Sequence, residues 1–489
     1  MWWKILLALL ALFIVVTLIR AIFYKPKKFE GVKIEDADID VDKVAEHLSK
    51  AIQCKTISRS NPDEIDWSEF EKFHAFLDEA YPLIKQNTVK ENVSKASLIY
   101  RWKGKNPDLE PMALLSHQDV VPVAEGTEDD WTHDAFSGYN DGEIIWGRGA
   151  LDMKNHLICV MEAVESLMEE GFQPERDVYL CFGHNEEIVC SNESGADEIV
   201  KVLRSRGIHL DSVLDEGSAL LRLDVKGLIH TYIAAVGVAE KGYADMKLTV
   251  HDKGGHTSAA PKHSGMAKLA NTIKDVERHQ FKSHMLPFLT ELFDTVGRKA
   301  TYLGRVVMCN VWLLKPIIKL VLKVIPESAS MVRTIQSISM CEGSPEPNVL
   351  PQRPSITVNF RPLPGDTVDD VEKHIRKAVR YKDLEVERLF SKEATKFSST
   401  DSRAFNAIRK VEEGLHPNDV AVAPYLVMGG TDSYRYGEIC DNILRYAPFN
   451  VSVELFLTTH ATNERCPISA LKESVVFFRE YIKEVSKKD

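Results

Sequence analysis

Three short apolar stretches of the chain each end in a turn that carries polar or acidic side chains. Residues 112–115 lead to His117 and Asp119, residues 178–182 lead to Glu186 and Glu187, and residues 212–214 lead to Asp215 and a turn at Gly217. Apolar runs of this length, bounded by turns, are typical of buried strands. In an open α/β sheet, polar residues at strand ends gather along the carboxyl edge, where ligand sites lie. The pattern therefore predicts an α/β fold with a functional site at that edge.

The size and charge of the chain limit the classes of protein to which it can belong. A chain of 489 residues exceeds the usual size of a single domain, so two domains are the first expectation. A net charge of −11, with no lysine-arginine run in the body of the chain, argues against a nucleic-acid-binding protein. The eight cysteines include no C-x-x-C pair, so neither a cysteine-bound zinc nor a disulfide scaffold is indicated.

Residues 1–28 are expected to form a signal anchor or a signal peptide. Residues 5–19 are apolar apart from Thr17, and Lys4 and Arg20 bound them. No convincing A-x-A cleavage motif follows, which favours an anchor. The excess of basic residues after this run predicts a cytosolic body, whereas sequons at Asn92, Asn192 and Asn450 favour the secretory lumen and glycosylation. We expect a membrane-anchored or secreted protein on the lumenal or extracellular side.

A change of pattern near Lys241 indicates an inserted domain. Residues 29–240 and 397–489 share an α/β character, whereas residues 241–396 contain segments in the order β-α-β-β-α-β, which is the ferredoxin-like arrangement. The inserted strands are expected at 243–250, 335–340, 356–360 and 384–389, and the helices at 265–276 and 368–379. We therefore predict a catalytic domain in two parts, 29–240 and 397–489, with a ferredoxin-like α+β lid domain inserted at 241–396.

A helical excursion near residues 281–332 interrupts the inserted domain. Within it, residues 311–325 are strongly apolar but place Lys315, Lys319 and Lys323 at intervals of four, which forms a basic stripe on one side of a helix. A core helix with one solvated stripe accounts for this pattern, and so does a helix that lies on a membrane surface. The sequence leaves both interpretations open.

Five side chains near the predicted strand ends have the chemistry of metal ligands. They are His117, Asp152, Glu187, Asp215 and His460. Imidazole nitrogen and carboxylate oxygen suit zinc, although cobalt or manganese can occupy such a site. Five ligands exceed the needs of one tetrahedral zinc, but two zinc ions that share one carboxylate would use all five. Asp119, two residues beyond His117, is suitably placed to fix the tautomer of that imidazole.

Three motifs relate these residues to a known family. Residues 116–123 (SHQDVVPV), 146–154 (WGRGALDMK) and 184–187 (HNEE) resemble, in the same order, the zinc motifs of the aminoacylase/carboxypeptidase family of dinuclear zinc hydrolases. The resemblance runs from about residue 41 to the C-terminus and includes the inserted domain. It implies a zinc-exopeptidase-type mixed sheet flanked by helices, with the ferredoxin-like α+β domain as a lid.

The resemblance also implies a role for each residue of the site. Asp152 would bridge two Zn²⁺ ions, His117 and Asp215 would complete one metal site, and Glu187 and His460 would complete the other. Glu186 would be the general base, which suits a carboxylate that lies next to a metal ligand without being one. On its own the Glu186–Glu187 pair reads as an acidic loop, so this division of roles rests on the motifs.

Four further residues acquire roles in substrate recognition from the same resemblance. His256, in residues 254–258 (GGHTS), would stabilise the oxyanion, and Asn348 and Arg361 would bind the α-carboxylate of the substrate. Gly430, in residues 429–433 (GGTDS), would lie in a glycine loop that approaches the substrate. Without the order of the motifs, these positions read as turn residues and a surface arginine.

The resemblance implies a zinc-dependent amidohydrolase that cleaves, and in reverse forms, the amide bond between an acyl group and a free amino acid. N-fatty-acyl amino acids are the substrate expected first, which rests on analogy within the resembled family and on the oily helix of the excursion. A carboxypeptidase that acts on short peptides is the alternative, and a catalytically silent, membrane-tethered binding protein is a third reading. Partners are then a small-molecule substrate, a membrane through the N-terminal segment, and a second copy through a lid-mediated homodimer, with no nucleic acid.

Overall fold

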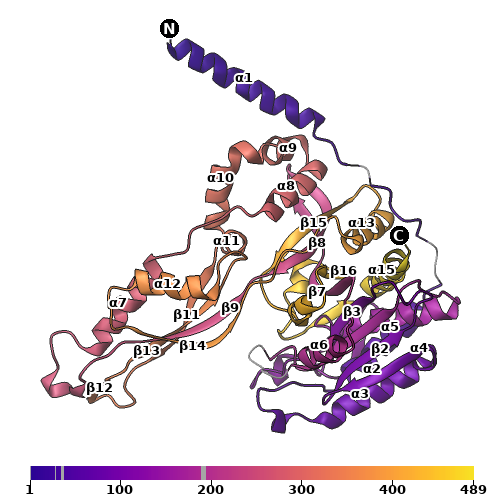
Figure 1. Cartoon of the computed structure of the whole chain (residues 1–489), viewed down its shortest axis with the longest axis horizontal. Coiled ribbons are helices and arrows are strands. Elements are labelled where there is room, and N and C mark those ends of the chain that lie inside the picture. The colour runs from indigo at the N-terminus through magenta and orange to yellow at the C-terminus, as the bar shows by residue number, and fades with distance from the viewer. Residues whose placement is uncertain (1, 28, 35–37, 189–193, 489) are drawn as a thin grey trace.

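The computed structural model describes residues 2–27, 29–34, 38–188 and 194–488 (Figure 1). Its main sheet has eight strands in the order β1-β2-β6-β3-β7-β16-β8-β15. The strands are β1 (Thr88–Val93), β2 (Ser97–Trp102), β3 (Met112–His117), β6 (Val178–Gly183), β7 (Ser212–Val225), β8 (Ile229–Glu240), β15 (Val420–Val427) and β16 (Ile443–Asn450). β3 runs parallel to β6 and β7, whereas β2 runs antiparallel to β6, so the sheet is mixed. This confirms the predicted α/β class.

Helices cover both faces of the main sheet, and this explains the continuous apolar runs of its central strands. In β3, Met112 and Leu114 face one core cluster, while Ala113 and Leu115 face another on the opposite side. The first cluster is formed with α2 (Val41–Ile52), α5 (Lys154–Glu169), α13 (Arg403–Leu415) and α15 (Ile468–Ser486), and the second with α6 (Gly195–Ser205). The remaining helices of this part are α3 (Trp67–Ala80), α4 (Pro82–Asn87) and α14 (Val453–Phe456).

A small three-stranded sheet brings two distant segments of the chain together at the edge of the main sheet. It has the order β17-β5-β4, from β4 (Tyr139–Asn140), β5 (Ile144–Trp146) and β17 (Arg465–Pro467). Trp146 pairs with Arg465 in antiparallel register. The loop after β5 therefore lies beside the residues that precede β17, which places Asp152 and His460 in the same region.

A second sheet of four antiparallel strands forms the inserted part, in the order β11-β13-β9-β14. Its strands are β9 (Tyr243–Thr249), β11 (Ile335–Glu342), β13 (Ser355–Arg361) and β14 (Glu385–Lys392), and its helices are α7 (Gly265–Arg278) and α12 (Val368–Ala378). This order and connectivity are those of the predicted ferredoxin-like motif. We refer to these elements and their connections as the lid. The division of the chain into domains at 240/241 and 396/397 remains a prediction.

The helical excursion consists of α8 (Pro287–Lys299), α9 (Tyr302–Met308), α10 (Val311–Val324) and α11 (Pro326–Val332). α8 packs against β15 of the main sheet, so the excursion returns from the lid to the catalytic part before it ends. α1 (Trp2–Phe23) is a helix of 22 residues whose length and composition suffice to cross a membrane, and its last turns lie beside α9 (Figure 1). A signal sequence meets the same criteria.

Candidate metal centre

His117 is the last residue of β3, and its buried imidazole lies at the carboxyl edge of the main sheet. Its Nδ1 donates to the backbone carbonyl of Asp119 at 2.9 Å and lies 3.6 Å from the Asp119 carboxylate. With the proton held on Nδ1, the lone pair of Nε2 stays available as a ligand. Nε2 lies 3.1 Å from Asp152 Oδ1 and 3.5 Å from Glu216 Oε1.

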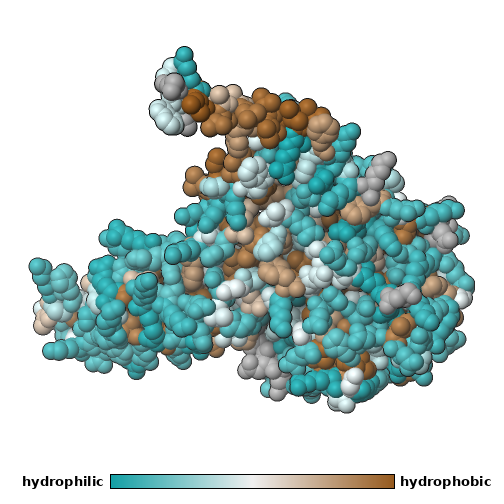
Figure 2. Space-filling view, turned by 45° about the horizontal axis from the view of Figure 1, so that its top comes forward, coloured by the Kyte–Doolittle hydropathy of each residue, from teal (hydrophilic) through white to brown (hydrophobic). Residues whose placement is uncertain are grey.

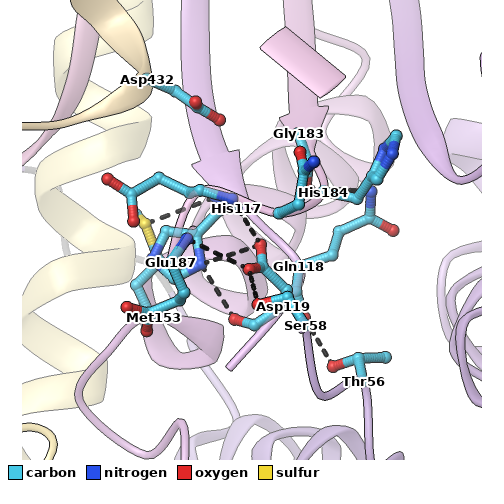
Figure 3. A network of polar contacts seen from close by, with 12 residues as sticks. Thr56, Ser58, His117, Gln118, Asp119, Met153, Gly183, His184, Glu187 and Asp432 are labelled. Carbon is cyan, nitrogen blue, oxygen red and sulfur yellow. Dashed lines mark hydrogen bonds and ion pairs between the residues drawn. The ribbon is translucent and has the colours of Figure 1, made fainter. Parts of the chain in front are cut away.

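The carboxylate of Asp119 holds the base of the centre together (Figure 3). It is fully buried, and it accepts hydrogen bonds from Ser58 Oγ at 2.6 Å, from the Glu186 N–H at 3.1 Å and from the Glu187 N–H at 3.2 Å. Asp119 therefore holds the imidazole of His117 through its backbone carbonyl and holds the loop that presents both glutamates through its side chain. The role of Asp119 in the reaction remains a prediction.

Asp152 lies at the middle of the centre and offers one oxygen to each side. Its Oδ1 faces His117, while its Oδ2 lies 2.9 Å from His460 Nε2, which in turn lies 3.1 Å from Glu187 Oε2. Two groups of potential ligands result: His117, Asp152 and Glu216 form one, and Asp152, Glu187 and His460 form the other. Two cation positions that share one carboxylate are the arrangement these side chains fit.

The structure brings Glu216 to the first group and turns Asp215 away from it. The sequence predicts that the strand ends before Gly217, but β7 continues to Val225, so Asp215 and Glu216 point to opposite faces. Asp215 is buried, and its Oδ2 accepts a hydrogen bond from the Ser433 N–H at 2.9 Å. The assignment of Asp215 as a ligand remains a prediction from the motif, whereas the geometry favours its neighbour Glu216.

The carboxylates of the centre repel one another unless positive charge lies between them. Burial and the nearby carboxylate of Asp152 raise the pKa of Glu216 well above its ordinary value, although His117 lowers it in part. Burial also raises the pKa of Asp152, but hydrogen bonds from His117 and His460 outweigh burial and leave that pKa lowered. Hydrogen bonds to Asp152 and Glu187 raise the pKa of His460 to about 10. Carboxylates packed this closely are suited to divalent cations, which would supply the positive charge between them.

Glu186 lies next to the ligands and lines a pocket of its own. Burial raises its pKa well above the ordinary value, and the carboxylates of Glu187 and Asp432 add to the effect while His117 opposes it. A glutamate with a raised pKa, beside a metal centre and open to a pocket, has the properties of a general base that later acts as an acid.

The pocket beside Glu186 is rich in cationic side chains. Arg361, Lys392 and Arg435 line it together with Tyr243 and Gly430. The guanidinium of Arg361 lies over the ring of Tyr243 at 4.5 Å and donates to Asn359 Oδ1 at 3.2 Å, and neither contact neutralises its charge. Arg361 and Gly430 therefore line the same pocket as Glu186, and Lys392 joins them from β14, while their roles in substrate binding remain predictions.

A second cavity lies against Asp152 and Glu216 and has a different character. Apart from those two carboxylates, its lining is largely apolar and includes Ala219, Phe449, Val451 and Phe456. The two cavities share no lining residue, and each adjoins a different part of the acidic centre. The site therefore combines a cationic half and an apolar half.

His256 and Asn348 lie far from this centre along the lid. β10 (Gly255–His256) pairs with β12 (Val349–Leu350) at the end of the lid that points away from the main sheet (Figure 1). The ring of His256 is exposed and bonds Ser258 Oγ at 2.8 Å. The backbone carbonyl of Asn348 accepts a hydrogen bond from the Thr257 N–H at 3.1 Å. Among the described residues, neither side chain contacts a member of the centre in the same chain.

Sequence reasoning missed Glu464, which fixes the loop that carries Asp152. This fully buried carboxylate accepts hydrogen bonds from the N–H groups of Gly149, Leu151 and Asp152, and it pairs with Arg148 at 2.5 Å. Because Glu464 follows His460 by four residues, it couples the positions of two ligands. An acid in the stretch after His460 was visible in the sequence, but its partners belong to a segment more than 300 residues away.

Comparisons with known proteins agree with this geometry. Residues 113–484 match the model of peptidase family M20/M25/M40. A probable carboxypeptidase S-like protein of Dictyostelium discoideum is 35% identical over 91% of this chain and 85% of the relative. An N-fatty-acyl-amino acid synthase/hydrolase of Danio rerio is 31% identical over 89% of this chain and 84% of the relative.

Solved structures support the fold. An M20 family metallo-carboxypeptidase from Sulfolobus solfataricus aligns over 92% of this chain and 99% of its own, with a TM-score of 0.63 and 17% identity. Human carnosine dipeptidase 1 aligns over 92% of this chain and 97% of its own, with a TM-score of 0.61 and 16% identity. At these identities the likeness concerns the fold alone, and it confirms the predicted sheet flanked by helices.

Proposed function

The chain belongs to peptidase family M20/M25/M40 and is a metal-dependent hydrolase of amide or peptide bonds; we propose that its substrates are N-acyl amino acids with long acyl chains. The observation that carries this proposal is the pair of cavities at the acidic centre. Arg361 and Lys392 provide the cationic side for a carboxylate, and Phe449, Val451 and Phe456 line an apolar cavity of about 80 Å³ that suits the first carbons of an acyl chain. A fatty-acyl amino acid has this same polarity along its length.

The proposed metals are two Zn²⁺ ions that share Asp152. His117 and a carboxylate of the Asp215–Glu216 pair would complete one position, and Glu187 and His460 the other. When bound, such ions would polarise the amide carbonyl and lower the pKa of a water molecule at the site. The nitrogen and oxygen donors suit zinc, and the exposed side of His460 leaves room for a substrate.

Glu186 is the proposed general base. Its carboxylate would take a proton from the attacking water and deliver it to the leaving amine nitrogen, so that the amide bond breaks into a carboxylic acid and a free amino acid. The hydrogen bond from the Glu186 N–H to Asp119 fixes the backbone from which this side chain projects. In reverse, the same proton path supports synthesis of the amide.

Arg361 is the proposed anchor for the α-carboxylate of the amino-acid part, with Gly430 allowing close approach. A Cβ at Gly430 would collide with Lys392 Nζ, so a larger residue there would displace this cation. A guanidinium can donate two parallel hydrogen bonds to a carboxylate, which would fix the scissile amide relative to Glu186.

His256 and Asn348 are proposed to serve the site of a second copy through a lid-mediated homodimer. Both lie at the far end of the lid, exposed and away from the centre of their own chain (Figure 1). A second copy that packs its lid against the first would bring the exposed His256 ring toward a substrate carbonyl, where an imidazole can stabilise an oxyanion.

We further propose that α1 keeps the protein at a membrane as an uncleaved anchor, with the catalytic part on the lumenal side. Its length supports a span. Asn92 is exposed on β1 and Asn450 is half-buried at the end of β16, so the first of these sequons is accessible to glycosylation. Asn192 lies outside the described residues.

A panel of substrates tests the proposed specificity. N-acyl phenylalanines of increasing chain length, from acetyl to oleoyl, are compared with dipeptides in the presence of Zn²⁺, using kcat/KM as the readout. We expect kcat/KM to rise with acyl length, because each added methylene gains apolar contact. A carboxypeptidase of short peptides, the second candidate, is favoured by the name of the Dictyostelium relative. Turnover of dipeptides without turnover of oleoyl-phenylalanine would support that second candidate and reject the first.

A further inference from the structure

α9 and α10 expose apolar side chains where a helix on a protein surface normally presents polar ones. Ile317, Leu320 and Val324 of α10 are exposed by 60%, 64% and 75%, and Trp312 by 59%. We refer to Ile317, Leu320, Val321 and Val324, with Leu303 of α9, as the apolar patch, whereas Trp312 lies on the side of α10 that carries Lys315 and Lys319. Exposed apolar side chains scattered singly need no explanation, but a contiguous set on one surface marks a contact with another apolar partner.

The spacing of the patch shows that α10 has a defined outward face. Ile317, Leu320 and Val324 recur at intervals of three and four, so they share one side of the helix. Leu322 instead packs against the main core, which fixes the orientation of α10. The apolar patch therefore remains outside after the helix has packed.

The apolar patch lies beside the last turns of α1. Tyr302 donates to the carbonyl of Leu18 at 3.2 Å, Asn310 donates to the carbonyl of Thr17 at 3.4 Å, and the guanidinium of Arg20 lies over the ring of Trp312 at 5.9 Å. Figure 2 shows the apolar surface of α1 next to the apolar surface of the helices beneath it. These contacts tie α9 and the start of α10, the helices that carry the patch, to the helix that is long enough to cross a membrane.

We propose that the apolar patch of α9 and α10 rests in the lipid bilayer that α1 enters, so that the catalytic part docks on the membrane surface by a second contact. Lys315, Lys319 and Lys323 lie along one stripe of α10, where lysine side chains can reach lipid phosphates while the apolar face enters the acyl region. Together with Arg20 they favour an anionic bilayer. The proposal rests on the membrane anchorage proposed above, and it places an acyl-amino-acid hydrolase at the phase in which long-chain substrates dissolve.

Photo-crosslinking of the full chain in vesicles tests this contact. p-Benzoylphenylalanine replaces one residue at a time: Leu320 in the patch, Leu389 on β14 of the lid as the matched exposed control, and Leu10 in α1 as the reference for anchorage. Leu389 is exposed by 50% and Leu10 by 54%, so all three positions accept the substitution without disturbing a core. The chain is reconstituted in vesicles of phosphatidylcholine and phosphatidylserine, irradiated, and analysed for lipid adducts by mass spectrometry.

We expect lipid adducts at positions 320 and 10 and no lipid adducts at position 389. Adducts at position 10 alone would leave the anchor intact and overturn the docking proposal. A crosslink from position 320 to a second chain would overturn it in favour of a protein partner. An absence of lipid adducts at position 10 as well as at position 320 would reject the membrane anchorage, and the docking proposal with it. Turnover of a soluble N-acetyl amino acid by each variant checks that the chain has folded.

Discussion

Glu186 and Glu187 are neighbours in the chain, but their surroundings assign them different tasks. Glu187 lies close enough to Asp152 and His460 for the three side chains to hold one metal ion. Glu186 instead lines the cationic pocket, and burial raises its pKa. A glutamine at either position keeps the shape of the side chain and removes its ability to carry a proton or a full negative charge. The two substitutions therefore separate the base from the ligand.

Glu186→Gln is expected to lower kcat by about 10²–10⁴-fold, which is the usual contribution of general acid–base catalysis. The metal content and the melting temperature should stay close to those of the parent chain, because Glu186 is not among the ligand groups. Glu187→Gln is the matched control and should lose metal from the same loop. Undiminished turnover by Glu186→Gln with metal retained would remove Glu186 from the mechanism.

A second pair of adjacent acids decides which side chain completes the first metal position. Glu216→Gln is expected to reduce the metal content of the purified chain, because Glu216 Oε1 lies 3.5 Å from His117 Nε2. Asp215→Asn should retain more metal, since the hydrogen bond that Asp215 accepts from the Ser433 N–H can be made by an amide oxygen. Metal analysis of both variants checks this, and loss from Asp215→Asn alone would restore the assignment made from the motif.

Several site residues could be predicted from the sequence because they stand at the ends of short, buried strands. His117 ends one strand and Glu187 follows another, and both strands are buried throughout, so the position of these residues at the sheet edge follows from the apolar runs. The choice between Asp215 and Glu216 could not be predicted, because β7 runs on past Gly217 and alternation places successive side chains on opposite faces. The role of Glu464 depends on pairing between β5 and β17, which local pattern does not reveal.

Among the elements, α13 carries a buried acid whose titration affects stability. Burial raises the pKa of Glu412 to about 7, above the ordinary value of 4.5, even though Tyr446 donates a hydrogen bond to it at 2.7 Å. Because the folded chain holds this proton more tightly than the unfolded chain, folding gains stability from it at low pH. That gain is lost as the pH rises from about 4.5 to about 7.

Glu412→Gln is expected to be more stable than the parent chain at pH 8. Between pH 4.5 and pH 8, the difference in free energy of unfolding between variant and parent should shift in favour of the variant by up to about 3 kcal/mol. The glutamine oxygen still accepts from Tyr446, but it carries no charge that burial must suppress. Unfolding by urea at the two pH values, with parent and variant side by side, measures the difference. An equal difference at both pH values would show that the pKa of Glu412 is the same in the folded and the unfolded chain.

The order of elements in the lid could be predicted, but the attachment of the excursion could not. Alternating strands and amphipathic helices specify the β-α-β-β-α-β order, and the observed antiparallel sheet follows from it. An apolar helix face shows that a helix packs against something but not against which element. The contacts of α8 with β15 and of α9 with α1 therefore could not be predicted from the sequence.

At the scale of the whole molecule, the position of His256 bears on whether two chains assemble into a homodimer. In a homodimer whose lid serves the partner, a site needs Glu186 from one chain and His256 from the other. Mixing Glu186→Gln with His256→Ala should therefore recover about one quarter of the parent activity, because random pairing gives half heterodimers with one complete site each. The two variants measured separately are the controls. No recovery after mixing would place His256 in its own chain or outside the reaction.

Metal content measured together with hydrolysis tests the central claim most directly, namely that this acidic centre is a dinuclear metal site that cleaves acyl amino acids. The purified chain is analysed for zinc, cobalt and manganese, treated with a chelator, and assayed on N-oleoyl-phenylalanine before and after Zn²⁺ is restored. The account predicts two ions per chain, loss of turnover with loss of metal, and recovery on addition of Zn²⁺. Full turnover by a chain freed of divalent metal would contradict it.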